Sequence, residues 1–170
     1  MANEQTRDIF ILGLRNAHAM ETQALSILKP QLEWIDRYPE VADRIEAHIH
    51  ETEGQIGRLE EVLGSLNESR SALKDMALSL SGSMAALGHS MAGDEILKNS
   101  FANFAFENFE IAAYHSLITV GEHGGYASAV SALAQNLQEE ENMAKWLADN
   151  LEAVTRRFIS LSEAGEEAKI

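Results

Sequence analysis

The fold is decided by a connection, SLNESRSALKDMALSLSGSMAALGHSMAG, which spans residues 65–93. Long helical patterns at about residues 4–36 and 39–63 precede it, and patterns at about 94–121 and 126–151 follow it. Neighbouring antiparallel helices need only about 2–8 residues between them. This connection is long enough to return along the whole bundle, so we expect the third helix to start at the far end.

Each of the four flanking segments is predicted to be a helix. Their apolar residues recur at helical spacing, and the period-two alternation typical of strands is nowhere sustained. Pro39 suits the first turn of the second helix, and EHGGY, residues 122–126, predicts a turn before the fourth. The predicted fold class is therefore all-α, a four-helix bundle in which the long, partly helical crossover between helices 2 and 3 gives the ferritin-like arrangement.

We expect one domain over residues 1–170, because this length suits a single hydrophobic core. Its two helix pairs are expected at about residues 4–64 and 94–155, with the crossover at about 65–93. The C-terminal segment EAGEEAKI, residues 163–170, is expected to fray.

The composition excludes several classes of function. A formal net charge of −14, with only 13 Lys and Arg, argues against nucleic acid and anionic membranes as partners. Because no cysteine is present, disulfides and thiolate metal sites are excluded. The N-terminus does not have the pattern of a signal peptide, and no segment reaches the ~20 apolar residues that span a bilayer. We therefore expect a cytoplasmic protein.

Two glutamates interrupt one of the most apolar stretches of the chain, FENFEIAAYHSL, residues 106–117. Glu107 and Glu110 are three residues apart, so a helix places both on one side. Burying a lone carboxylate costs several kcal/mol unless a partner compensates for the lost hydration. The stretch therefore raises the question of what that partner is.

Similar residues lie on the apolar faces of the other three helices. Glu21 lies at the centre of the first stripe and Glu140 in the middle of the fourth. On the second helix Glu51 lies at the edge of the stripe, and His48, one turn earlier, lies nearer its middle. One such residue alone would usually extend to solvent or pair with a nearby Lys or Arg, but the set is harder to explain in that way.

The spacing of four glutamates predicts that they face one another. Glu21 and Glu51 are 30 residues apart, as are Glu110 and Glu140, and each pair is centred on its turn. Each glutamate is therefore about 15 residues, or ~22 Å of helix, from its turn. Four carboxylates at one level of an interior would repel one another unless cations neutralise them. We therefore expect two divalent metal ions, with iron as the first choice and manganese or zinc as alternatives.

The expected ligand set departs from the usual one in metal-binding bundles. That set has Glu-x-x-His on two helices, whereas here Gly54 and Met143 take the histidine positions after Glu51 and Glu140. His48 and Glu107 precede a glutamate by three residues and can complete the set from the other side. We expect Glu51 and Glu140 to bridge the metals. The predicted metal ligands are Glu21, His48, Glu51, Glu107, Glu110 and Glu140.

Four segments resemble one known family. They are HAMETQALSILKPQLE (18–33), HIHETEGQIGRLEEVLGSL (48–66), ENFEIAAYHSL (107–117) and LQEEENMAKWL (137–147). Together they are similar to the YciF/YciE-type bacterial ferritin-like proteins, with Met20 where that family usually has Ala. The resemblance implies a ferritin-like fold, a di-metal site, often a homodimer and a link to stress responses. It implies no established reaction.

Three functions are compatible with these patterns. The first is a di-iron or di-manganese carboxylate protein of the stress response that oxidises its metal or handles oxygen or peroxide. The second is a non-catalytic, dimeric helical stress or interaction protein whose metal site is structural or vestigial. The third is iron storage in a closed cage. Two residues have alternative roles: Tyr114 either donates a hydrogen bond to a ligand carboxylate or packs in the core, and His18 either joins the site or is partly exposed.

Overall fold

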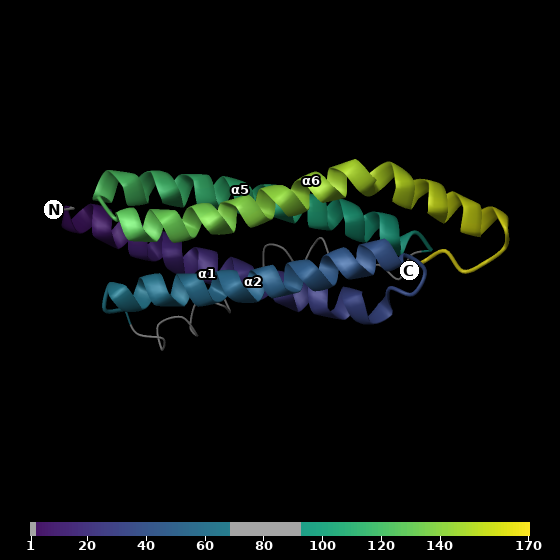
Figure 1. Cartoon of the computed structure of the whole chain (residues 1–170), viewed down its shortest axis with the longest axis horizontal. Coiled ribbons are helices and arrows are strands. Elements are labelled where there is room, and N and C mark those ends of the chain that lie inside the picture. Colours follow the sequence, from purple (N-terminus) through teal and green to yellow (C-terminus); the bar gives the residue numbers. More distant parts are fainter. Residues whose placement is uncertain (1–2, 69–92) are drawn as a thin grey trace.

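The computed structural model describes residues 3–68 and 93–170. This part of the chain forms four long helices and no strand, and Figure 1 shows how the helices are arranged. The helices are α1 (Glu4–Trp34), α2 (Pro39–Ser65), α5 (Glu95–Gly124) and α6 (Ala127–Glu163). The predicted all-α four-helix bundle is confirmed.

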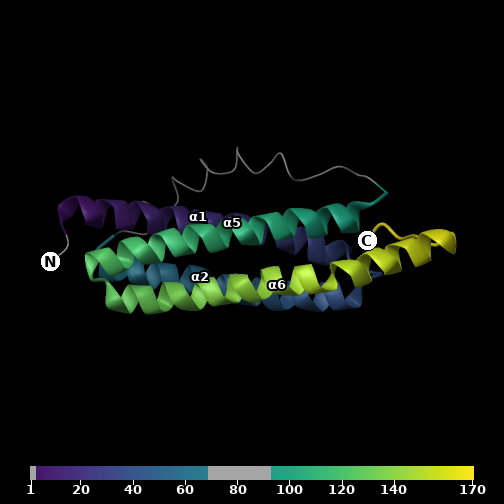
Figure 2. The ribbon, with the colours of Figure 1, turned by 90° about the horizontal axis from the view of Figure 1, so that it is seen from above.

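The order of the helices in space is that of a bundle with a long crossover. Contacts join α1 to α2, α5 to α6, α1 to α5 and α2 to α6. The two views agree that α1 and α6 run in one direction and that α2 and α5 run in the other (Figures 1 and 2). Because α2 and α5 are parallel, the end of α2 and the start of α5 lie at opposite ends of the bundle. The connection itself, residues 69–92, lies outside the described residues.

The helix boundaries have local causes. Asn3 caps α1, since its side chain accepts a hydrogen bond from the backbone N–H of Gln5 at 3.1 Å. Pro39 occupies the first turn of α2, where its missing N–H has no helical partner to lose. The helix α5 is followed by its cap, Gly125, whose φ of 75° is the left-handed conformation that favours glycine.

The hydrophobic core has two clusters, one toward each end of the bundle. Phe10, Leu14 and Leu133 belong to the cluster near the α5–α6 turn. Ile45 and Leu147 belong to the cluster near the α1–α2 turn. Buried polar side chains lie on all four helices, among and between the residues of these clusters. The surrounding apolar packing strengthens every electrostatic interaction among them.

The C-terminal segment differs from the frayed tail that the sequence predicts. The helix α6 continues to Glu163, and the chain then returns to the bundle (Figure 1). Ala168 is buried, and its carbonyl accepts a hydrogen bond from the Tyr38 hydroxyl at 2.6 Å. The carbonyl of Lys169 accepts from the backbone N–H of Ile96 at 2.9 Å. The segment thus satisfies polar groups at the start of α2 and of α5, which composition alone does not reveal.

Candidate metal centre

Five Glu and His side chains from the four helices are buried in the middle of the bundle. Each is at most 2% exposed, although Glu and His are rarely buried without partners. They come from α1 (Glu21), α2 (His48), α5 (Glu107 and Glu110) and α6 (Glu140). The arrangement brings together residues as far apart in the sequence as Glu21 and Glu140.

Three of these residues form a compact cluster that could hold a metal ion. His48 Nε2 lies 3.3 Å from Glu107 Oε2 and 3.5 Å from Glu140 Oε2. One ligand atom from each of the three lies within 4.8 Å of the other two. One imidazole nitrogen with two carboxylate oxygens is a donor set that iron, manganese and zinc accept.

Glu110 and Glu21 extend the acidic group beyond this cluster. Both carboxyl oxygens of Glu110 and the Oε2 atom of Glu21 are buried and have no hydrogen-bond partner among the described residues. A buried, unpartnered carboxylate oxygen is costly, so such an oxygen must take up either a proton or a cation. The residues present therefore fit a metal-binding role.

Protons take the place of cations when no metal is bound. Burial raises the pKa of Glu21 to about 8, although the hydrogen bond from Tyr114 opposes the shift. Burial, together with the negative charge of Glu21, raises the pKa of Glu140 to about 11. Burial and the charges of Glu21 and Glu140 also raise the pKa of Glu110 well above its ordinary value. A divalent cation would displace these protons, so its binding is linked to proton release.

His48 is held from both sides. Burial alone would lower its pKa, but hydrogen bonds with Glu107 and Glu51 outweigh burial and raise that pKa to about 9. The Nε2 atom faces the buried cluster, and the Nδ1 atom lies 2.9 Å from Glu51 Oε2. A metal bound at Nε2 would take the place of the Nε2 proton, while Glu51 still accepts from Nδ1–H.

Glu51 differs from the inward, bridging position that its spacing predicts. Its side chain is 32% exposed, and its Oε2 atom accepts a hydrogen bond from Arg44 Nη1 at 3.1 Å. On a helix Glu51 is rotated by about 60° from His48, toward the side where Arg44 lies. The helix α2 therefore contributes His48 to the buried group, and Glu51 contacts the outer nitrogen of that histidine.

Several supporting polar residues were not anticipated as part of the site. Gln55, which is buried, donates from Nε2 to Glu140 Oε1. Asn136, also buried, donates from Nδ2 to the Tyr114 hydroxyl at 2.9 Å. Their spacing could have identified them, because Gln55 lies two helical turns after His48 and Asn136 lies one turn before Glu140. A pattern restricted to acids and histidines does not include these amides.

Tyr114 and His18 now have defined surroundings. The Tyr114 hydroxyl donates to Glu21 Oε1 at 2.5 Å, which favours the first of its two anticipated roles. The Nε2 atom of His18 lies 3.5 Å from Glu60 Oε1, and His18 is not one of the cluster of three possible ligands.

Within the described residues, no helix is long and apolar enough to cross a membrane.

Comparison with solved structures supports both the fold and the predicted resemblance. A protein from Xanthomonas campestris is 28% identical, with a TM-score of 0.77 over 93% of this chain and 99% of that one. The E. coli stress protein YciF is 25% identical, with a TM-score of 0.69 over 88% of this chain and 96% of that one. YcfI from Rhodopseudomonas palustris is 24% identical and shares the fold, with a TM-score of 0.64 over 84% and 92%.

A protein-family model gives the same result from sequence alone. The model of the family described as "Domain of unknown function (DUF892)" matches residues 5–160. This range includes the five buried Glu and His residues and most of each helix. With the similarity to YciF, the match confirms the resemblance expected from the sequence: the chain belongs to the DUF892 family of YciF-type helical proteins.

Proposed function

We propose that this protein is a di-metal carboxylate protein that acts in a bacterial stress response. The observation that carries the proposal is the buried group of four glutamates and one histidine, several of whose oxygens lack a hydrogen-bond donor. The similarity to the stress protein YciF supports the biological setting. Bound iron or manganese would supply one-electron chemistry toward oxygen or peroxide.

The proposed ligands divide into two sets that share one residue. His48, Glu107 and Glu140 would hold one ion, and Glu21 and Glu110, together with Glu140, would hold the other. When ionised, the four buried glutamates carry four negative charges, and two divalent ions carry four positive charges. This balance supports two ions, because a single one would leave two buried charges without compensation.

The first prediction concerns metal content. Protein purified without chelator and then titrated with Mn²⁺ or, without oxygen, with Fe²⁺ should bind two equivalents. The His48→Ala variant should lose at least one of them, because it removes the only nitrogen ligand of the cluster. Glu46→Ala, which changes an exposed residue of the same helix, should still bind two. Fewer than two equivalents bound by the wild type would contradict the proposal.

Glu51 has a different proposed role, which a second prediction tests. We expect it to orient His48 by accepting from Nδ1–H, a common arrangement around metal-bound histidines. Glu51→Gln keeps an acceptor and should bind both ions nearly as well as the wild type, whereas Glu51→Ala should bind the ion at His48 about 10–100-fold more weakly. The measurement is Mn²⁺ titration calorimetry. Equal loss in both variants would instead indicate the ligand role that the sequence suggests.

A second candidate function is a dimeric interaction protein with a purely structural metal. It is favoured by the exposed phenylalanines of α5, namely Phe101, Phe104 and Phe109. The sequence from Phe101 to Gly121 contains no Asp, Glu, Lys or Arg except the two buried glutamates. An exposed apolar surface of this kind supports the predicted homodimer. A mass of 18.7 kDa by light scattering, which is that of one chain, would contradict the dimer.

Metal-dependent consumption of oxygen or peroxide separates the two candidate functions. A purely structural metal would raise the melting temperature, but the protein would consume neither oxygen nor peroxide.

A further inference from the structure

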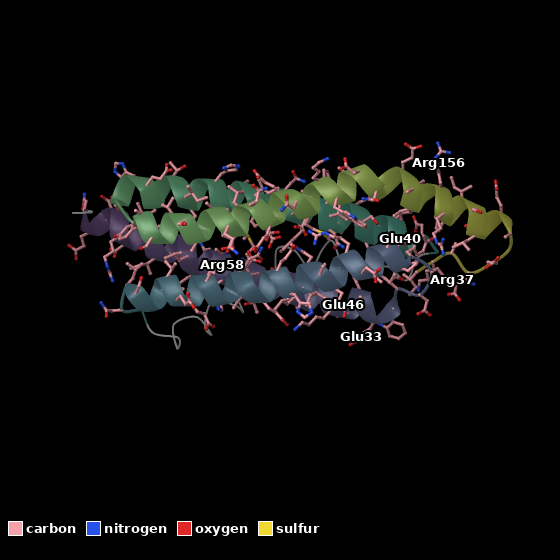
Figure 3. The ribbon with its side chains drawn as sticks, viewed as in Figure 1. Glu33, Arg37, Glu40, Glu46, Arg58 and Arg156 are labelled. Carbon is pink, nitrogen blue, oxygen red and sulfur yellow. The ribbon has the colours of Figure 1, made fainter. Side chains whose placement is uncertain are left out.

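A chain of hydrogen bonds crosses the bundle and ends on Glu21. It begins at Arg58 of α2, passes through Asn136 of α6 and Tyr114 of α5, and reaches Glu21 of α1. The Asn136–Tyr114 and Tyr114–Glu21 distances are 2.9 and 2.5 Å. The last three residues are fully buried, whereas the Arg58 side chain is 21% exposed between α2 and α6 (Figure 3).

The direction of this chain is fixed at its outer end. A guanidinium group donates hydrogen bonds and cannot accept them. Arg58 Nε therefore requires an acceptor, and Asn136 must present its Oδ1 atom rather than its NH₂ group. The Nδ2 atom of Asn136 then faces Tyr114 and donates to its hydroxyl oxygen. Since Tyr114 accepts from Asn136, its single proton is directed to Glu21.

Arg58 is itself held in place. Its Nη2 atom donates to Glu139 Oε2, and the other oxygen of Glu139 accepts from Gln135 at 3.1 Å. Glu139 thus has a defined function, although its neighbour Glu140 is the residue of this segment that points into the bundle. The anchored cation keeps the Asn136 amide from turning over, because a turned amide would place its NH₂ group against the guanidinium.

The inner end of the chain leaves one oxygen of Glu21 free. Its Oε1 atom accepts from Tyr114, and its buried Oε2 atom has no hydrogen-bond partner among the described residues. A donor on one carboxylate oxygen fixes the orientation of the group and favours its charged form, so the other oxygen is available to a cation. Hydrogen bonds that hold ligands in this way affect metal affinity by about 10–100-fold.

We propose that Arg58, Asn136 and Tyr114 form a directional hydrogen-bond chain that positions Glu21 to bind the second metal ion. The inference rests on the proposed function, because it assigns a role toward the ion held by Glu21 and Glu110. It makes Arg58, a residue at the surface, a positioning residue for a buried site. The three residues would act as a unit, since each orients the next.

A variant that reverses the direction of the hydrogen bond between Asn136 and Tyr114 tests the proposal. Asn136→Asp has nearly the same shape but only acceptors, so the Tyr114 hydroxyl would turn toward the introduced carboxylate and leave Glu21 without a donor. We expect the second Mn²⁺ ion to bind about 10–100-fold more weakly and the first to be nearly unchanged. An added negative charge alone would strengthen cation binding, so the expected change has the opposite sign. Asn150→Asp, the same change on the same helix, is the control, because among the described residues the Asn150 side chain bonds only to the Trp146 carbonyl.

Two further variants show whether the residues act as a unit. Tyr114→Phe should lower the affinity for the second Mn²⁺ ion as Asn136→Asp does. The double variant should bind that ion no more weakly than Tyr114→Phe alone. If Asn136→Asp does not fold, Arg58→Met and Arg58→Lys serve instead, because Arg58 is partly exposed. Arg58→Met should weaken the binding of the second ion. Arg58→Lys should keep that binding, because lysine, like arginine, donates hydrogen bonds and cannot accept them.

The outcomes separate this inference from the proposed function. Wild-type protein that binds two Mn²⁺ ions, with Asn136→Asp or Arg58→Met binding both equally well, would overturn the directional chain alone. Losses of affinity for the second ion that add up in the double variant would also overturn the directional chain. Wild-type protein that binds no second ion would overturn both proposals.

Discussion

Glu110→Leu should make the metal-free protein more stable and remove its capacity for the second metal ion. Both carboxyl oxygens of Glu110 are buried without a hydrogen-bond donor, and burial and neighbouring charges raise its pKa far above the ordinary value. An unsatisfied buried polar group costs about 1–3 kcal/mol, so an apolar side chain of similar volume at this position should stabilise the fold by about that amount. The same change removes a proposed ligand, so stability and metal binding should move in opposite directions.

Urea unfolding in EDTA and in saturating Mn²⁺ would measure both effects. The wild type should gain stability from Mn²⁺, and Glu110→Leu should gain much less, because it binds fewer ions. Glu46→Leu is the matched control, since Glu46 is exposed on α2 and the change should alter neither quantity by more than about 0.5 kcal/mol. A metal-free Glu110→Leu protein that is less stable than the wild type would show that the carboxyl group contributes to the fold by itself.

The second large effect is a loss of stability in the metal-free protein as pH rises from 6 to 9. The pKa of Glu21 is raised from 4.5 to about 8 and that of Glu140 to about 11, because both are buried. The pKa of His48 is raised from 6.5 to about 9, since its hydrogen bonds with Glu107 and Glu51 outweigh its burial. Over this range the folded protein holds protons that the unfolded chain has released, so folding weakens with rising pH. We expect a slope on the order of 1–3 kcal/mol per pH unit.

Metal should remove this dependence. Bound cations replace the protons on the carboxylates, so the folded, metal-loaded protein no longer holds more protons than the unfolded chain. The difference in unfolding free energy between Mn²⁺-loaded and EDTA-treated protein should therefore widen from pH 6 to pH 9. Chemical denaturation at pH 6, 7, 8 and 9 measures it. Stability of the metal-free protein that increases over this range would contradict the account of the buried group.

Much of the candidate site could be predicted from the sequence, because helix geometry is regular. A constant rise per residue and an antiparallel turn are enough to bring Glu110 to the level of Glu140. A central position in an apolar stripe is likewise enough to predict that Glu21 is buried. The parallel directions of α2 and α5 could also be predicted, because so long a connection allows the third helix to start at the far end of the bundle.

Two expectations differ from the structure: the inward position of Glu51 and the frayed C-terminal segment. Both depend on hydrogen bonds with neighbouring groups, which the spacing and composition do not show. Glu51 lies at a stripe edge, where hydrogen bonds to Arg44 and to the outer nitrogen of His48 hold it partly exposed. The C-terminal segment docks because Tyr38 and the start of α5 offer donors to its carbonyls. Its own composition carries no sign of those partners.

Anomalous diffraction at the manganese and iron edges, from crystals of reconstituted protein, tests the central claim most directly. The account predicts two peaks in a polar layer in the middle of the bundle, formed by the buried glutamates and His48. One should lie among His48, Glu107 and Glu140, and the other should lie beside Glu21 and Glu110. Fully occupied crystals without a peak in this layer, with the glutamates hydrogen-bonded to one another instead, would contradict it.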